Sequence, residues 1–163
     1  MKFAIYDFEI TVPKEWKIAI DKKSSYVSGM VGFTTVKGTA ADLIWENLDR
    51  YMSKHTSVEA FLENYFEGMK NNRNIKTIEI NKGLTKTTNE HTFLPHEFRY
   101  DYKQPLSRGF SQKVIGVAMY DLHSNRFAIV FSRWDPNKEN PDEPSIREAL
   151  GTFDCLCNKG TNL

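Results

Sequence analysis

The chain has 163 residues, of which 40% are hydrophobic and 26% charged, and it contains 11 Phe, 7 Tyr and 3 Trp. This composition excludes a disordered chain, and the length fits one domain over residues 1–163. The net charge of +1 lacks the basic excess typical of nucleic-acid binding, and no stretch has the roughly 18 apolar residues of a membrane helix. We therefore expect neither nucleic acid nor a membrane as partner. Asp7 precedes any apolar secretory segment, which predicts a cytoplasmic location.

The first third of the chain has the two-residue apolar period of half-buried strands. The stretches with this period are residues 8–12, 16–20, 27–36 and 43–47. Pro13 ends the first, because proline cannot donate to a strand ladder. Gly29 and Gly32 indicate a bulge or a close backbone approach in the third. An antiparallel meander is predicted.

At Thr56 the apolar period becomes that of a helix. The apolar side chains at helical spacing are Val58, Phe61, Leu62, Tyr65, Phe66 and Met69. Thr56 and Glu59 have the spacing of a capping box. The pattern predicts a main helix over residues 56–72 whose apolar face packs on the sheet.

The strand period returns after this helix. It covers residues 75–81, 97–103, 110–121 and 126–134. Residues 135–144 carry three prolines and predict a loop, and residues 145–153 predict a short closing helix. The predicted fold class is therefore α+β: an antiparallel sheet of about seven strands packed against one main helix (56–72), with a short C-terminal helix (145–153).

Three short stretches resemble one known family. They are residues 8–16, which read FEITVPKEW, the strand at 125–131, and Thr152-Phe153 after the closing helix. They resemble the PsbP-like fold family, which includes subunit P of photosystem II and a nuclear-import factor that binds the GTPase Ran. A prokaryotic or archaeal member is what the chain resembles most. The resemblance spans most of the chain, but its motifs consist of core residues. It implies the fold and, because most members are non-catalytic, a binding or assembly role.

No sequence motif names a reaction. The chain has no glycine-rich nucleotide loop, no G-x-S-x-G and no H-E-x-x-H, so we predict a non-enzymatic protein with no catalytic residue. A hydrolase or isomerase is least favoured, because no nucleophile with a nearby base can be named. Glu90-His91 and His96-Glu97 are two acid–imidazole pairs, but the odd offset between the histidines places them on opposite faces. We interpret this stretch as a solvated hairpin end.

Cys155 and Cys157 are the two cysteines. A disulfide between them would close a very small ring, so two reduced thiols are predicted. With a histidine such as His55 or His123 they could bind a soft divalent ion. Structural zinc sites usually have wider spacings and four ligands, so we predict no metal, no cofactor, and two partly buried apolar residues.

The predicted partner-binding residues are Arg133, Trp134 and Asp135. They stand where the last long strand enters the proline-rich loop, and arginine and tryptophan are enriched at interfaces. Packing of this loop onto the sheet is the alternative interpretation of Trp134. We therefore predict a protein-binding or accessory module whose partner is another protein. The alternative is a small-ligand or metal-binding domain with a pocket between helix and sheet.

Overall fold

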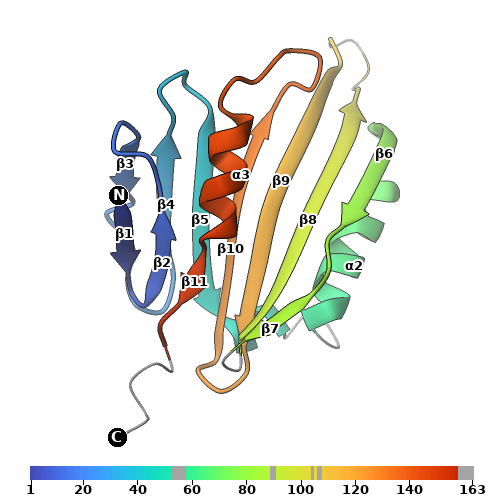
Figure 1. Cartoon of the computed structure of the whole chain (residues 1–163). Helices are drawn as coiled ribbons and strands as arrows, with labels where there is room; N and C mark the ends of the chain where they lie inside the picture. Colours follow the sequence, from blue (N-terminus) through green and yellow to red (C-terminus); the bar gives the residue numbers. More distant parts are fainter. Residues whose placement is uncertain (53–57, 89–90, 104, 106–107, 158–163) are drawn as a thin grey trace, which may run out of the picture.

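A long antiparallel sheet of eight strands forms the body of the computed structural model (Figure 1). The structure describes residues 1–52, 58–88, 91–103, 105 and 108–157. The strand order is β3-β4-β5-β10-β9-β8-β6, and β7 also pairs with β8. A second sheet of three short strands has the order β1-β2-β11. No described helix is long and apolar enough to cross a membrane.

The main sheet has the following strands: β3 (Lys17–Ile20), β4 (Gly29–Thr34), β5 (Ala40–Asn47), β6 (Ile75–Lys82), β7 (Lys86–Thr88), β8 (His91–Tyr102), β9 (Phe110–Asp121) and β10 (Arg126–Trp134). The second sheet has β1 (Lys2–Ile5), β2 (Phe8–Thr11) and β11 (Asp154–Cys155). The helices of the described residues are α1 (Leu48–Met52), α2 (Val58–Lys70) and α3 (Glu143–Gly151).

The two faces of the main sheet bury separate apolar clusters. On one face, here called the α3 face, α3 and the second sheet cover Leu43, Trp45 and Val130, and α3 contributes Ile146 and Leu150. On the other, the α2 face, Phe66 lies against Phe98. Central strands covered on both sides explain the nearly continuous apolar run at 114–120.

The α+β class and the antiparallel sheet agree with the sequence prediction, but three details differ. The main sheet has eight strands rather than about seven, and β1 and β11 join β2 in a second sheet. The described residues hold three helices rather than one main helix and one short one. The prediction missed β1 because its hairpin turn, Tyr6-Asp7, has positive φ angles of 47° and 70° without the glycine that usually marks such turns.

The predicted helix bounds need small corrections. Helix α2 lies within the predicted 56–72, and the predicted cap at Thr56 lies outside the described residues. Helix α3 begins two residues before the predicted 145, because Pro144 is accommodated in the first turn, where no backbone donor is needed. It ends at Gly151, before the predicted 153.

The stretch around His91 and His96 is not a solvated hairpin end. Both histidines are buried in β8, and they lie on opposite faces, as their odd offset predicts. Pro95 is tolerated inside β8 because the neighbouring edge is interrupted there: β6 ends at Lys82 and β7 begins at Lys86. The strand therefore begins at His91 rather than at residue 97.

Gly29 confirms the predicted close approach. A Cβ atom there would lie 2.3 Å from Cζ2 of Trp45, closer than two carbons can approach. At Gly32 the nearest atom, Asp42 Oδ1, would be 3.6 Å away, an ordinary contact. The pairing of β4 with β5 is regular, so the bulge alternative does not apply.

Phe66→Ala should lower the free energy of unfolding by roughly 3–5 kcal/mol, because the ring is 2% exposed and its removal leaves a cavity beside Phe98 and His96. Chemical denaturation measures the loss, with Glu67→Ala on the exposed side of α2 as the control. A loss below about 1 kcal/mol would show that α2 is not part of the core. Of the other residues on the predicted apolar face of this helix, Met69 is partly buried. The structure does not describe the side chains of Val58, Phe61, Leu62 and Tyr65.

Candidate functional site

The predicted residues Arg133, Trp134 and Asp135 do not form one surface. Because neighbouring residues in a strand point to opposite faces, Arg133 is exposed on the α2 face and Trp134 packs partly buried on the α3 face. Burial raises the pKa of Asp42, and the nearby charge of Arg133 offsets this only in part. Asp135 starts the loop and accepts a hydrogen bond from the Asn137 backbone at 3.0 Å. Trp134 therefore lies on the α3 face, and the Arg133 side chain does not.

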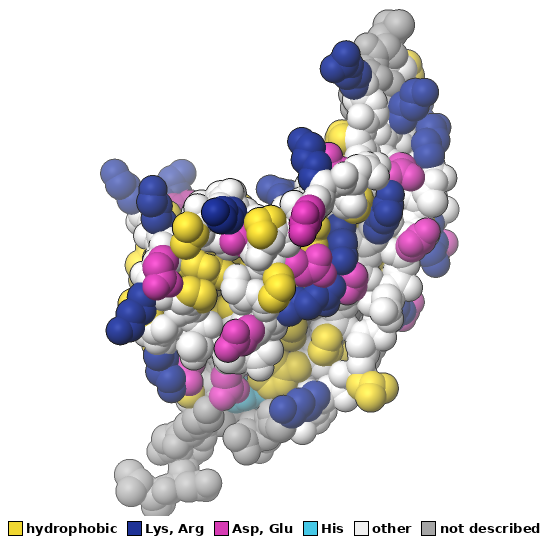
Figure 2. Space-filling view, turned by 45° about the horizontal axis from the view of Figure 1, so that its top comes forward, with side chains coloured by type: hydrophobic (Ala, Val, Ile, Leu, Met, Phe, Trp, Pro, Cys, Tyr) yellow, Lys and Arg dark blue, Asp and Glu magenta, His cyan; other side chains and the backbone are white. Residues whose placement is uncertain are grey.

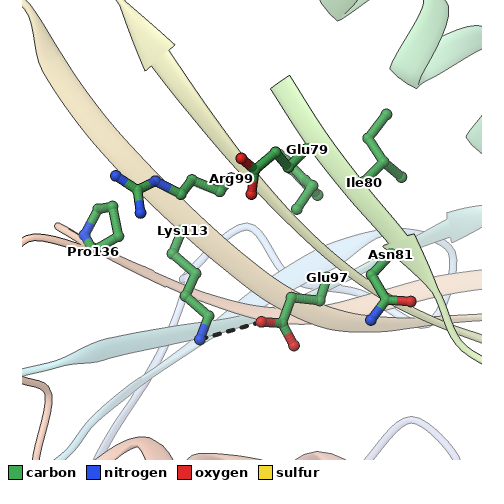
Figure 3. A pocket seen from close by; sticks show the side chains of 8 residues that line it. Glu79, Ile80, Asn81, Glu97, Arg99, Lys113 and Pro136 are labelled. Atoms are coloured by element: carbon green, nitrogen blue, oxygen red, sulfur yellow. Dashed lines mark ion pairs between the residues drawn. The ribbon is translucent and has the colours of Figure 1, made fainter. Parts of the chain in front are cut away.

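A hollow of about 410 Å³ lies on the α3 face, and one of its lining residues is Lys113 (Figure 3). We call it the charged groove; its polar and loop residues are Glu79, Asn81, Glu97, Arg99, Lys113 and Pro136. A second hollow of about 320 Å³ continues it toward α3, since Asn81 and Glu97 line both. Figure 2 shows side chains of both charge signs gathered on this side of the molecule.

Four charged side chains tie α3 to the floor of this groove. The Lys113 ammonium lies 3.2 Å from a Glu97 oxygen and 3.0 Å from a Glu143 oxygen. The Arg147 guanidinium lies 2.9 Å from Glu97 and 2.6 Å from Glu143. Partial burial alone would raise the pKa of both carboxyls, but hydrogen bonds from Arg147 and Lys113, together with their charges, lower it. Both glutamates therefore stay ionised and held in place.

Lys113 also supports Trp134. Its Nζ lies 5.3 Å from the centre of the indole ring, within the range of a cation–π contact. Trp134 is opposite Lys113 in the pairing of β10 with β9. The tryptophan is thus held against the same cation that pairs with Glu97 and Glu143.

Arg99 is the cation of the groove with the most spare donors. It is exposed, and Nη2 donates to Asn137 Oδ1 at 3.4 Å, a long hydrogen bond. Glu79 of β6 and Lys113 of β9 are its cross-strand neighbours, and Figure 3 shows Arg99 extending toward Pro136. A guanidinium carries five N–H donors, so Arg99 can accommodate a carboxylate from a partner.

The sequence analysis did not predict the charged groove, although the alternation of residues in β8 indicates part of it. Glu97 and Arg99 alternate with the apolar Phe98 and Tyr100, which places the two charges on the face opposite α2. The partners Glu143 and Arg147 come from α3, and no sequence pattern tells over which strand a closing helix will lie.

A second cluster lies on the same face at the other end of β8. The His91 Nε2 atom lies 3.2 Å from Asp121 Oδ2 and 3.7 Å from the Cys157 sulfur. The described histidine near the cysteines is therefore His91; His123 is exposed, and His55 lies outside the described residues. Burial would raise the pKa of Asp121, but hydrogen bonds from Ser124 and the His123 backbone, with the charge of His91, lower it.

The prediction of two reduced thiols is wrong for this structure, in which Cys155 and Cys157 form a disulfide. Residues two apart in an extended segment point to the same side, and these two Cα atoms are 5.6 Å apart, inside the usual range of about 4.4–6.8 Å. Cys157 is partly buried, as predicted, whereas Cys155 is fully buried.

Comparison with known proteins identifies the fold. No protein-family model and no curated protein sequence matches the chain. The solution structure of cyanobacterial PsbP (CyanoP) from Synechocystis sp. PCC 6803 matches over 95% of this chain and 91% of that chain, with a TM-score of 0.61 and 10% identity. The chain has a PsbP-like fold. The predicted resemblance is thus confirmed at the level of the PsbP-like fold.

Arg147→Ala should destabilise the protein by less than about 1 kcal/mol at pH 7, because the arginine is half-exposed and its ion pairs are screened. The pKa values of Glu97 and Glu143 are lowered, so their contribution is complete above about pH 4.3, the unfolded value, and disappears as the pH falls through the folded values. Urea unfolding of both proteins between pH 7 and pH 3 measures the difference.

The exposed Lys22 provides the matched control, since it follows β3 at the edge of the main sheet away from β8, and Lys22→Ala removes a cation there. A difference for Arg147→Ala that stays constant down to pH 3 would show that the arginine acts through packing and not through the two carboxylates.

Proposed function

We propose that the protein is a non-enzymatic binding or accessory module that recognises another protein through Trp134 and the charged groove. The observation that carries this proposal is the position of Trp134: it is partly buried and held on Lys113, whose other cross-strand neighbour is the exposed Arg99. Tryptophan and arginine are the residues most enriched among those that dominate binding energy. The PsbP-like fold supports the same role, because the resembled family consists mostly of binding and assembly factors.

The loop beside Trp134 is ordered before any partner binds. Three prolines restrict residues 135–144, and Asp135 caps the first turn through Asn137. At the other end, the Asp142 carboxylate accepts hydrogen bonds from the hydroxyls of Thr35 at 2.5 Å and Thr39 at 3.0 Å. Binding at this loop would therefore cost little additional ordering.

The chemistry of the groove favours an acidic and apolar segment of another protein as the occupant. Arg99 offers donors to a carboxylate, and the partly exposed Trp134 offers apolar surface. The carboxylates of Glu97 and Glu143 are occupied by Lys113 and Arg147 and have lowered pKa values, which suits neither to general base catalysis near neutral pH. On these grounds we propose binding without catalysis, in the cytoplasm as the sequence predicts.

A small-ligand site between helix and sheet is the weaker candidate. The hollows of about 410 and 320 Å³ have the size of ligand pockets, but such pockets are mostly apolar. Here Glu97, Arg99, Lys113 and Arg147 line them, and most of these charges already have partners. A ligand would have to displace ion pairs to bind.

Co-purification from a native lysate tests the proposal, with the wild-type chain and Trp134→Ala, Arg99→Ala and Arg133→Ala as bait. We expect Trp134→Ala and Arg99→Ala to weaken capture of the same partner by about tenfold or more, as the loss of a central contact does. Arg133→Ala is the matched control, since it removes an exposed arginine from the opposite face.

The captured protein is then purified and its affinity for each variant is measured directly. Unchanged affinity for both Trp134→Ala and Arg99→Ala would exclude the charged groove as the binding surface. An equal loss in Arg133→Ala would instead place the surface at the end of β10, where the sequence prediction puts it.

A further inference from the structure

His91, Asp121 and the two cysteines form a cluster that the proposed binding function does not use. The cluster joins the first residue of β8, the last of β9 and the end of β11. His91 is 1% exposed, and Asp121 and Cys155 are fully buried. The His91 Nε2 atom and the two sulfurs all lie within 4.8 Å of one another.

Packing does not account for this cluster. A disulfide stabilises mainly by closing a long loop in the unfolded chain, and this one spans two residues in sequence, so its cross-linking effect is small. A buried imidazole–carboxylate pair costs desolvation that apolar side chains of similar volume avoid. The meeting of these four residues, three of them buried, therefore points to a chemical role.

The sequence analysis predicts no metal, but the position of His91 beside the two cysteines changes that expectation. We propose that the reduced cysteine pair, with His91, forms a binding site for a thiophilic divalent cation of the zinc type. Two thiolates and one imidazole nitrogen are the ligands that Zn²⁺ prefers. Asp121 Oδ2 lies 3.2 Å from the same nitrogen and places a negative charge beside the site, and a solvent molecule completes the four-coordinate shell of the cation.

The geometry needs little rearrangement. Zinc–sulfur and zinc–nitrogen bonds of about 2.3 and 2.0 Å place the ligands of a tetrahedral site roughly 3.5 Å apart. The His91 nitrogen and the Cys157 sulfur are already 3.7 Å apart. Opening the disulfide separates the sulfurs, and the partly exposed Cys157 lies beyond the last strand.

The cation and the disulfide exclude each other, because a disulfide sulfur is not a thiolate. A small-molecule dithiol reduces the protein disulfide by supplying two electrons and two protons. The sulfur–sulfur bond between Cys155 and Cys157 breaks to give two thiols, and the reductant is itself oxidised to a disulfide. Binding of the divalent cation then releases both thiol protons to solvent. In the reducing cytoplasm, the predicted location, the cysteines are in the form that binds the ion.

Titration of the full chain with Zn²⁺ against a chromophoric chelator tests the site. The protein is used in two forms: reduced with a dithiol and desalted without oxygen, and oxidised to the disulfide. We expect about one Zn²⁺ per reduced chain and none for the oxidised chain. Co²⁺ in place of Zn²⁺ should give the thiolate charge-transfer band and the intense visible bands of a tetrahedral site.

Cys157→Ser is the deciding variant, because residue 157 is partly exposed beyond the last strand and its change should leave the fold intact. It should weaken binding by at least about a hundredfold, since loss of an outer-shell partner alone costs 10–100-fold. His91→Gln should weaken binding similarly, and His123→Gln, an exposed histidine close in sequence to Asp121, is its control. Circular dichroism confirms that each variant is folded.

Two results would overturn the proposal. One is a reduced wild-type chain that binds well under one Zn²⁺, which would leave the disulfide and the His91–Asp121 pair as structural features. The other is binding that persists unchanged in Cys157→Ser. Neither result bears on partner capture through Trp134, so the two proposals fail separately.

Discussion

The register between β8 and β9 determines where both candidate sites lie. The strands pair over eleven residues, from Thr92 opposite Tyr120 to Tyr102 opposite Phe110. A shift by one residue would turn every side chain of one strand to the other face. His96 and Gly116 stand opposite each other, and a Cβ atom on Gly116 would lie 2.9 Å from the His96 ring. The buried imidazole thus fits opposite a glycine, which favours this register over its neighbours.

This register places the two sites on one face, at different points of the same strands. Glu97 and Lys113 reach the α3 face at the groove, and His91 meets Asp121 where the two strands end. The second sheet brings Cys155 to this cluster, because β11 pairs with β2 and Cys155 is opposite Phe8 in that pairing. A further contact holds that sheet to the main one. The Arg126 guanidinium is 3% exposed, lies 4.4 Å from the ring centre of Phe8 and donates to the Tyr6 carbonyl at 2.9 Å.

How far the sequence could predict these features follows from the range of the interactions involved. The strand and helix periods are local, so the α+β class, the antiparallel strands and the position of α2 could be read from them. The second sheet depends on pairing between residues about 145 positions apart, Glu9 with Asp154, which no local pattern contains. Long-range contacts also explain why the predicted site residues differ from the residues of the observed site. Trp134 was identified from its own strand end, whereas Arg147 and Glu97 meet only after α3 has packed.

Asp121 shows why the buried histidine is available for chemistry. Its Oδ1 accepts backbone hydrogen bonds from His123 at 2.8 Å and Ser124 at 3.2 Å, and its Oδ2 accepts the Ser124 hydroxyl at 2.6 Å. The turn after β9 therefore compensates most of the cost of burying this carboxylate, without help from His91. A carboxylate that depended on the imidazole would be left unpaired whenever His91 turned its Nε2 lone pair to a cation. Because the turn holds Asp121 in place, His91 can exchange a hydrogen bond for a metal bond at small cost to the fold.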